Sequence, residues 1–242
     1  MYKMYNVLDN LDLTLTSGKT YGLLGKNGAG KSTLINILTE FVQKDSGLIQ
    51  FDGIDIGKNE VISLKKEIGL VSEENSLIEE FSGNEYLDFV GNLYKIPKTE
   101  LYHRIKSLSE YFFEDLHDLD KYISKYSTGM KKKLEICAAV LHKPNFLILD
   151  EPFAGLDIVA VNQLLDFLKK YQNGKRIILI SGHSLNYIDK IVIHILVLKE
   201  GKIIFDGSIE EFTSNGKESI DKSLFEKLGV VSQKMEGIEW VF

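Results

Sequence analysis

The sequence predicts an α/β protein with a parallel sheet at its core and a helical insert within the chain. Short apolar runs bounded by polar residues are typical of strands buried on both faces. Three such runs, "FLILD", "RIILIS" and "IVIHILVL", lie in the second half of the chain, separated by segments of helical pattern. Between residues 73 and 142 the apolar residues recur with helical spacing instead. At 242 residues the chain has the length of one large domain.

The N-terminal part of the chain combines predicted strands with a glycine-rich loop. "KTYGLL" (19–24) is short and apolar and predicts a buried strand. The loop 25–30 follows, and "KSTLINILTEF" predicts a helix directly after it. "GLIQFDGIDI" predicts an antiparallel hairpin that turns at Asp52 and Gly53, and "EIGLVS" predicts a further strand. We therefore expect an antiparallel β part near the N-terminus, beside the parallel core.

The helical insert begins with a capping signature. Ser82 and Glu85 have the S-x-x-E spacing of a capping box ahead of "YLDFVGNLY", and helical periodicity continues through "TELYHRIKSLSEYFF". From about residue 217 the polar, mixed composition predicts a helix and a loosely docked tail. We expect a single domain over residues 1–242, made of a core (1–72 and 143–215), a helical subdomain (73–142) and a C-terminal tail (216–242).

Composition and charge exclude several classes of protein. The net charge of −6 and the pI near 5.5 argue against nucleic acid as the main partner. Cys137 is the only cysteine, so no internal disulfide exists, and its apolar neighbours predict a buried, inert thiol. The N-terminus has no signal-peptide pattern, and the longest apolar run is too short to span a bilayer. We expect a cytoplasmic protein that acts on a membrane only through a partner.

The segment "GKNGAGKS" has the residues and the context of a phosphate-binding loop. It fits G-x-x-x-x-G-K-[ST] and lies between a predicted strand and a predicted helix. Glycines let backbone N–H groups wrap a phosphate, and the helix N-terminus adds positive potential. Lys31 is expected to reach the β- and γ-phosphates, Ser32 to bind Mg²⁺, and Thr33 to extend the donor set. The expected contacts are Gly25, Lys26, Asn27, Gly28, Ala29, Gly30, Lys31, Ser32 and Thr33.

Two further segments fit the same chemistry. "NFLILDEP" is an apolar strand that ends in two carboxylates, so Asp150 is a candidate Mg²⁺ ligand and Glu151 a candidate base for the attacking water. "KYSTGMKKKLEI" begins with Ser127, a good N-cap, and Gly129, where a ligand can approach the backbone. This helix start has the features of an anion site, although an ordinary capped, solvated helix has the same pattern.

The motifs "GKNGAGKS", "YSTGM", "FLILDEP", "AGLD" and "ISGHS", in this order, resemble those of the nucleotide-binding subunit of ABC transporters over about residues 2–207. The resemblance implies the P-loop NTPase fold of an ABC cassette, with ATP and Mg²⁺ as cofactors. It also implies that two cassettes pack head to tail, so that Ser127 and Gly129 contact the ATP held by the partner cassette. Tyr126, Thr128 and Met130 depart from the common L-S-G-G-Q of the family.

Other site residues carry over from the resemblance one at a time. His183 in "ISGHS" resembles the switch histidine at the γ-phosphate, and Asp157 in "AGLD" resembles the aspartate of the loop that crosses the dimer interface. Glu73 stands where the family usually has a glutamine that touches Mg²⁺, with Glu74 as a neighbouring candidate. Tyr2 fits best as the aromatic that stacks on adenine, ahead of Tyr5. The family has a strand before this point, and the chain is expected to lack it.

The resemblance implies an ATPase that drives transport, most similar to the bacterial exporter branch, with a separate permease chain and a second cassette, identical or different. The cassette would then be peripheral on the inner face of the cell membrane, with no direct membrane span. Two alternatives stay open. A soluble ABC protein that acts on ribosomes or DNA is disfavoured by the single cassette and the negative charge. A regulatory subunit with a degenerate nucleotide site is left open by the altered "YSTGM" segment, by Glu73 and by the late start of the chain relative to the family.

Overall fold

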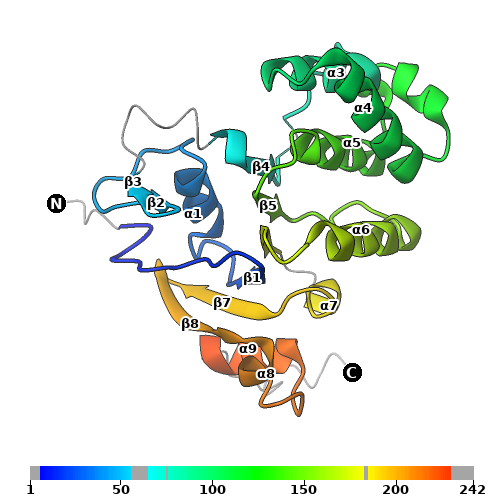
Figure 1. Ribbon diagram of the computed structural model, residues 1–242. Helices are drawn as coiled ribbons and strands as arrows, with labels where there is room; N and C mark the ends of the chain where they lie inside the picture. The colour runs from blue at the N-terminus through cyan, green and yellow to red at the C-terminus, as the bar shows by residue number, and fades with distance from the viewer. Residues whose placement is uncertain (1–5, 56–64, 75, 183–184, 230–242) are drawn as a thin grey trace, which may run out of the picture.

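The computed structural model describes residues 6–55, 65–74, 76–182 and 185–229 (Figure 1). Tyr2 and His183 lie outside these residues. Within them the centre of the molecule is a six-stranded sheet in the order β4-β5-β6-β1-β7-β8. Neighbouring strands are parallel except for β8, which runs antiparallel to β7. The prediction of an α/β fold with a parallel core is confirmed.

Five of the six strands of the sheet coincide with predicted apolar runs. In chain order they are β1 (Thr20–Leu24), β4 (Ile68–Val71), β5 (Phe146–Asp150), β6 (Ile177–Ser181), β7 (His194–Lys199) and β8 (Lys202–Ser208). β8 is not among the predicted strands. β5, β6, β1 and β7 have neighbours on both sides, which agrees with their continuous apolar sequences.

The described helices include short turns as well as long elements. They are α1 (Lys31–Leu38), α3 (Gly83–Leu93), α4 (Lys98–Phe112), α5 (Thr128–Val140), α6 (Ile158–Tyr171), α7 (Leu185–Ile188), α8 (Ile209–Phe212) and α9 (Ile220–Leu228), with 3₁₀ turns η1 (Leu116–Asp120) and η2 (Ile123–Lys125). α9 confirms the helix predicted after residue 217. None of the helices in the described part of the chain combines the length and the apolar character needed to cross a membrane.

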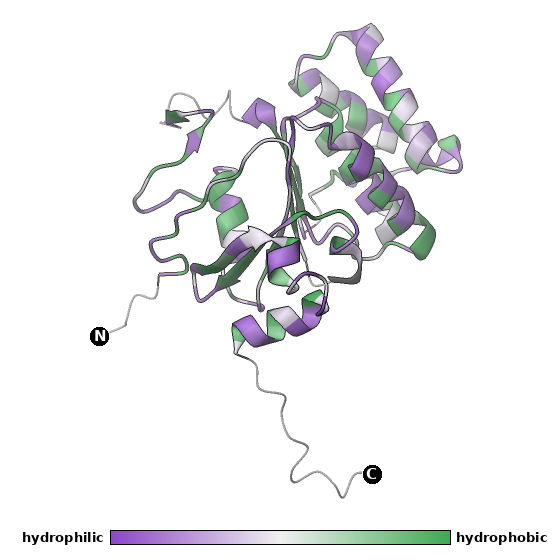
Figure 2. Cartoon of the chain, turned by 60° about the horizontal axis from the view of Figure 1, so that its bottom comes forward, coloured by the Kyte–Doolittle hydropathy of each residue, from purple (hydrophilic) through white to green (hydrophobic). Residues whose placement is uncertain are grey.

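The sheet is covered on both faces. Alternate residues of a strand point to opposite faces, so β5 contributes to two core clusters. Leu147 and Leu149 pack in the cluster that contains residues of α5 and α6, whereas Ile148 packs with Leu34 and Ile35 of α1. Figure 2 shows hydrophobic strands at the centre of the molecule and alternating hydrophilic stretches on the outer helices. Because these strands are buried in the sheet, the residues that come directly after them lie at its edge.

The predicted hairpin is present as a short, separate two-stranded sheet. β2 (Gln50–Phe51) pairs antiparallel with β3 (Ile54–Asp55). Asp52 and Gly53 form the turn, with φ angles of 50° and 77°. Positive φ at both central residues is typical of the tight hairpin turns that favour Asp-Gly. Among the described residues these two strands are the antiparallel β part expected near the N-terminus.

α3, α4, α5 and the two 3₁₀ turns pack together as a helical lobe (residues 83–140) at the top of Figure 1. The predicted capping box is confirmed, because the Ser82 hydroxyl accepts from the Glu85 N–H and the Glu85 carboxylate accepts from the Ser82 N–H. Cys137 of α5 is fully buried, and burial raises the pKa of its thiol, in agreement with the predicted inert role.

His142 connects the end of α5 to the sheet. Its Nε2 lies 3.0 Å from the Ile68 carbonyl oxygen at the start of β4, and its ring stacks on Tyr94 with centroids 3.7 Å apart. Burial lowers the pKa of His142 from 6.5 to about 4. A neutral imidazole therefore holds this joint between the helical lobe and the sheet.

The buried His142 predicts a pH-dependent loss of stability. The folded-state pKa lies below the unfolded value, so the stabilisation is complete above about pH 6.5 and is lost as the pH falls toward 4, by about 3 kcal/mol at most. Urea unfolding at several pH values between 7.5 and 4.5 measures this slope. In His142→Gln the slope should be shallower over that range, and an unchanged slope would mean that other groups cause the acid sensitivity.

Candidate functional site

The carboxyl ends of four parallel strands meet at one edge of the sheet, and three of these strands lead into predicted site residues. The glycine loop follows β1, Asp150 ends β5, Ser181 ends β6, and Glu73 lies two residues after β4. Ligands of open α/β sheets bind in the crevice outside these carboxyl ends. Because β6 lies between β5 and β1, the carboxylates and the loop are close to each other.

The glycine loop has conformations and contacts that require glycine. Gly28 and Gly30 have positive φ angles of 77° and 106°. A Cβ added to Gly25 would lie 2.4 Å from the carbonyl oxygen of Leu198. At Gly28 an added Cβ would meet no atom of the described residues within 4 Å, so this part of the loop faces open space. The loop can therefore present backbone N–H groups to a phosphate.

The N-terminus of α1 is available to an anion. Gly30 is its N-cap, and no side chain of the described residues caps the helix. The first N–H groups of a helix have no partner within the helix, and its dipole favours negative charge there. Around this N-terminus Lys26, Asn27, Gly28 and Ser32 are exposed, Thr33 is half-buried, and Ala29 and Gly30 are buried. The exposed positions surround the place where a phosphate would bind.

Lys31 is buried with its ammonium group turned onto the loop itself. Its Nζ donates to the carbonyl oxygen of Gly25 at 2.9 Å and to that of Lys26 at 3.3 Å. Burial lowers the pKa of Lys31, and the nearby carboxylates of Glu151, Asp150 and, more weakly, Glu73 oppose this shift. Lys31 and the three predicted acidic residues therefore form one electrostatic site.

Asp150 is held in place by a neighbouring strand. It is 5% exposed, and its Oδ1 accepts a hydrogen bond from the hydroxyl of Ser181, which is fully buried. The two residues pair across β5 and β6. A buried carboxylate needs such donors or a cation to offset the loss of water. Ser181 is a positioning residue that the sequence analysis does not predict.

Glu151 has a left-handed backbone, with a φ of 49°. Its N–H donates to the Ser181 carbonyl oxygen at 3.1 Å, which fixes the residue to the end of β6. A Cβ added to Gly182 would lie 3.1 Å from Glu151 Oε2, so the carboxylate lies close over this glycine. Residues other than glycine in this conformation are uncommon and concentrate at functional sites.

Glu73 is exposed on the loop that follows β4. The glycine loop follows the parallel strand β1 at the same edge of the sheet, and the Glu73 carboxylate opposes the lowering of the Lys31 pKa. The preceding residue, Ser72, accepts a hydrogen bond from Lys132 of α5 at 3.1 Å through its carbonyl oxygen. The loop that carries Glu73 is thus attached to the helical lobe.

The "YSTGM" segment forms the start of α5. Ser127 is the N-cap, and its hydroxyl accepts from the Met130 N–H at 3.2 Å. Ser127 and Thr128 are exposed. A Cβ added to Gly129 would lie 3.3 Å from the Gly155 carbonyl oxygen. The structure therefore places this segment beside the "AGLD" loop.

Thr128 fits against a glycine of the "AGLD" loop. Gly155 has a φ of 75°, and a Cβ there would lie 2.6 Å from the Thr128 side-chain methyl carbon. A larger residue at position 155 would therefore displace Thr128. Asp157, at the end of this loop, is the N-cap of α6, and its Oδ1 accepts from the Ala160 N–H at 2.8 Å.

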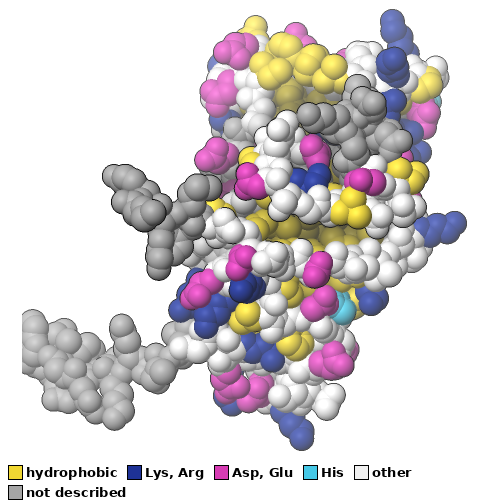
Figure 3. Space-filling view, turned by 90° about the vertical axis from the view of Figure 1, so that its left-hand side faces the viewer, with side chains coloured by type: hydrophobic (Ala, Val, Ile, Leu, Met, Phe, Trp, Pro, Cys, Tyr) yellow, Lys and Arg dark blue, Asp and Glu magenta, His cyan; other side chains and the backbone are white. Residues whose placement is uncertain are grey.

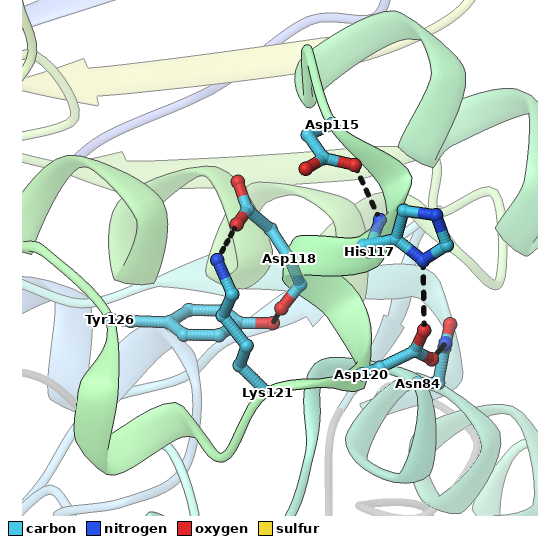
Figure 4. A network of polar contacts seen from close by, with 7 residues as sticks. All are labelled: Asn84, Asp115, His117, Asp118, Asp120, Lys121 and Tyr126. Atoms are coloured by element: carbon cyan, nitrogen blue, oxygen red, sulfur yellow. Dashed lines mark hydrogen bonds and ion pairs between the residues drawn. The ribbon is translucent and has the colours of Figure 1, made fainter.

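Tyr126 is the first residue of the "YSTGM" segment, here called the signature segment (residues 126–130). It joins this segment to a polar network in the helical lobe (Figure 4). It is 7% exposed, and its hydroxyl donates to the Asp118 carbonyl oxygen at 2.8 Å. Burial raises its pKa to about 12, so the hydroxyl stays protonated as a donor. The hydroxyl lies 2.3 Å from where a Cβ on Gly83 would be, so glycine is required there.

The same network ties η1 to α3 and to the segment that follows η1. Asn84 of α3 donates to the Asp120 carboxylate at 2.9 Å, and Lys121 donates to the Asp118 carboxylate at 2.5 Å (Figure 4). The substitution of tyrosine for the common leucine thus keeps an apolar ring in the core and adds an anchor for the residue before Ser127.

The sequence comparison decides the family. A profile of the family described as "ABC transporter" matches residues 8–154, which is more than half of the chain. The matched part contains the glycine loop, the signature segment and the two carboxylates described above. The chain belongs to the ABC transporter family. It is an ATP-binding cassette and an ATPase, and the predicted cassette fold is confirmed.

Individual ABC proteins resemble the cassette over most of its length. "ABC transporter ATP-binding protein NatA" of Bacillus subtilis (strain 168) is 29% identical over 229 residues, covering 93% of this chain and 92% of that one. "Lantibiotic transport ATP-binding protein SrtF" of Streptococcus pyogenes is 31% identical over 233 residues, covering 93% and 95%. A structure described as "Structure of ATP binding subunit of ABC transporter" has a TM-score of 0.85 and 27% identity, covering 93% and 95%.

A buried ion pair in this ABC cassette is absent from the sequence predictions. Lys132 Nζ lies 3.0 Å from Glu135 Oε2, and both residues are 7% exposed. Burial raises the pKa of Glu135, and the Lys132 ammonium opposes the shift. A glutamate inside the apolar run "LEICAAVL" is the signal that could have indicated a paired, buried charge.

Proposed function

We propose that two such cassettes pack head to tail, identical or different, and that the pair drives export through a separate permease chain. The observation that supports this most directly is the exposed start of α5. Ser127 is exposed at the N-cap of α5, and Gly129 lies beside Gly155 of the "AGLD" loop. An N-terminal anion site in this position suits a phosphate that a second cassette presents.

The glycine loop holds the phosphates of ATP in this proposal. The N–H groups of Gly25–Gly30 and the uncapped N-terminus of α1 donate to phosphate oxygens. Lys31 turns from the loop carbonyls to the β- and γ-phosphates, and Ser32 and Thr33 add hydroxyl donors. Tyr2, which lies outside the described residues, stacks on the adenine.

The carboxylates fit a site for Mg²⁺. Asp150, oriented by Ser181, and the exposed Ser32 supply oxygen ligands, with Glu73 at the edge of the site. No group of three His, Cys, Asp or Glu side chains that could enclose a metal occurs among the described residues, which suits an ion held by one or two protein ligands and by phosphates. When bound, Mg²⁺ neutralises charge on the transferred phosphoryl group.

Glu151 is the proposed general base. Its carboxylate accepts a proton from the water whose oxygen attacks the γ-phosphorus, while the bond to the β-phosphate oxygen breaks and ADP leaves. His183, outside the described residues, contacts the γ-phosphate. Ser127 and Gly129 of the second cassette donate to the same phosphate, and Asp157 lies at the contact between cassettes. Lys31 and Ser127 thus stabilise the developing charge from two chains.

The permease is proposed to dock on the helical lobe. Phe89 and Leu93 of α3 are 40% and 64% exposed, and Phe89 packs edge-on against Phe81 with ring centroids 5.7 Å apart. Figure 3 shows hydrophobic side chains gathered at the top of one face, over the helical lobe. Exposed apolar patches often mark protein interaction sites. The relative that carries "Lantibiotic transport" in its name supports an export role.

In this proposal each part of the chain has a separate role. The core (1–72 and 143–215) binds ATP, the helical subdomain (73–142) carries the signature and receives the permease, and the tail (216–242) is peripheral. In this arrangement the cassette works on the cytoplasmic side of the membrane, held there by the permease.

Complementation between two inactive variants tests the head-to-tail arrangement. Lys31→Ala should lose phosphate binding, and Gly129→Asp should block the signature, so each protein alone should lose nearly all ATPase activity. In a mixed dimer one site combines an intact glycine loop with an intact signature. Mixing the two variants should therefore restore a measurable part of the wild-type rate, as followed by phosphate release.

The control for this experiment is a mixture of Lys31→Ala with Lys31→Ala/Gly129→Asp, which contains no intact site. If the complementary mixture is as inactive as this control although both variants bind to each other, the two sites do not form between chains and the proposal is wrong. If identical chains do not associate with Mg-ATP, the experiment is repeated with a cassette encoded beside this one.

A further inference from the structure

A groove beside the helical lobe is lined by none of the residues assigned to ATP binding or hydrolysis. It lies between α4 and the end of α5 on one side and α6 and the start of β6 on the other, at the right of Figure 1. Its volume is about 970 Å³. Pro144 and Arg176 precede β5 and β6, so the groove lies at the amino ends of these strands, opposite the carboxyl ends that form the nucleotide site.

The floor of the groove is aromatic. The rings of Tyr111, Phe167 and Tyr171 are half-buried and follow one another, with centroids 5.8 Å apart between the first two and 5.5 Å between the last two. The Tyr111 hydroxyl donates to the Gln163 carbonyl oxygen and the Tyr171 hydroxyl to the Pro144 carbonyl oxygen, both at 3.0 Å. Because the hydroxyls bond to the protein, the rings offer the groove mainly carbon.

The rim is basic. Four lining residues, Arg104, Lys143, Lys170 and Arg176, are cationic, whereas Glu100 is the one lining carboxylate among the described residues. This contrasts with a net charge of −6 for the whole chain. Arg104 and Lys143 share Glu100, at 2.5 Å and 3.5 Å. Neither of the other two cations has an ion pair with a carboxylate within the described ranges.

Arg176 forms the link between rim and floor. Its guanidinium stacks on the ring of Tyr171, 4.2 Å from the centroid, and donates to the Tyr171 carbonyl oxygen at 2.8 Å. A planar cation held over an aromatic ring is positioned for a planar anionic group and for an aromatic ring beside it. Lys170, one residue before Tyr171, places a second exposed cation at the same end of the groove.

We propose that this groove binds an amphiphilic organic anion, with an aromatic body on the Tyr111–Phe167–Tyr171 floor and a carboxylate, sulfonate or phosphate group between Lys170 and Arg176. Concave sites of this volume that combine an apolar floor with a few polar groups are typical of small-molecule binding. The bound molecule would touch α4 and α6 together, and so connect the helical lobe to the core.

The test uses two fluorescent probes with the same ring system. 8-Anilinonaphthalene-1-sulfonate carries the anion, and N-phenyl-1-naphthylamine lacks it. In Lys170→Glu the affinity for the sulfonate should fall about tenfold, because attraction becomes repulsion, while the affinity for the neutral probe should stay unchanged. Lys169→Glu changes the net charge equally but alters a lysine outside the groove, so its affinities should match the wild type.

A second variant tests whether the probes bind inside the groove. Ser107 is exposed and lines the groove, so Ser107→Trp should fill it without disturbing the core and should weaken both probes. The proposal is wrong if Lys170→Glu and Lys169→Glu lower sulfonate binding equally, or if Ser107→Trp leaves both probes bound as before. It is also wrong if Ser107→Trp changes the size of the protein in solution while probe binding persists, since a second copy would then cover the groove.

Discussion

Glu151→Gln should reduce ATP turnover by roughly 10²–10⁴-fold, because the amide cannot accept the proton of the attacking water. ATP binding should persist, since Lys31 and the glycine loop are unchanged. Phosphate release measures the first effect, and nucleotide binding at equilibrium measures the second. Glu200→Gln is a matched control, because Glu200 also has a positive φ, of 50°, but lies at the exposed turn between β7 and β8.

The same variant reports on association. If hydrolysis at Glu151 opens the pair of cassettes, blocking it should trap an ATP-dependent dimer, which light scattering detects as a doubling of mass with Mg-ATP. Normal turnover by Glu151→Gln would remove the assignment of the base. If turnover is lost but the mass does not change with Mg-ATP, the assignment of Glu151 as the base stands. The partner would then be a different cassette.

Lys132→Met should destabilise the fold by about 3–5 kcal/mol, because it leaves the buried Glu135 carboxylate without its cation. The ion pair, at 3.0 Å, lies where α5 meets the loop after β4, and Lys132 also donates to Ser72. Removing both charges together leaves no unpaired charge in the core. Lys132→Met/Glu135→Leu should recover most of the stability, since a buried pair replaced by apolar side chains is often neutral.

Urea unfolding of the wild type, the single variant and the double variant measures this cycle. Lys133→Met, at a half-buried neighbouring position of α5 that has no ion pair with a carboxylate of the described residues, is the control for the loss of one positive charge. A double variant as unstable as Lys132→Met would show that the hydrogen bond to Ser72, and not the orphaned charge, carries the stabilisation.

The local sequence pattern was sufficient to predict most of the helices and strands. "FLILD" and "RIILIS" are short apolar runs and became β5 and β6, while Ser82 with Glu85 and Asp52 with Gly53 carry their cap and turn chemistry within four residues. These features depend on interactions between residues close in sequence, and such interactions can be recognised without the fold.

The order of the strands could not be predicted in the same way. β1 lies between β6 and β7, whose residues follow it by more than 150 positions. Likewise the support of Asp150 by Ser181, the anchoring of Tyr126 on Asp118 and the fit of Thr128 against Gly155 join separate segments. The motif around Asp150 indicated its role, but the residues that orient it are visible only once the sheet is formed.

The position of β1 has a consequence for how the protein is made. β1 carries the glycine loop, yet both of its neighbours in the sheet lie between Ile177 and Lys199. A ribosome must therefore synthesise most of the chain before this strand can pair, and until then its apolar residues are exposed in the nascent polypeptide. Such non-local pairing slows folding and favours aggregation. We expect chaperones to associate with the nascent chain until β7 has emerged.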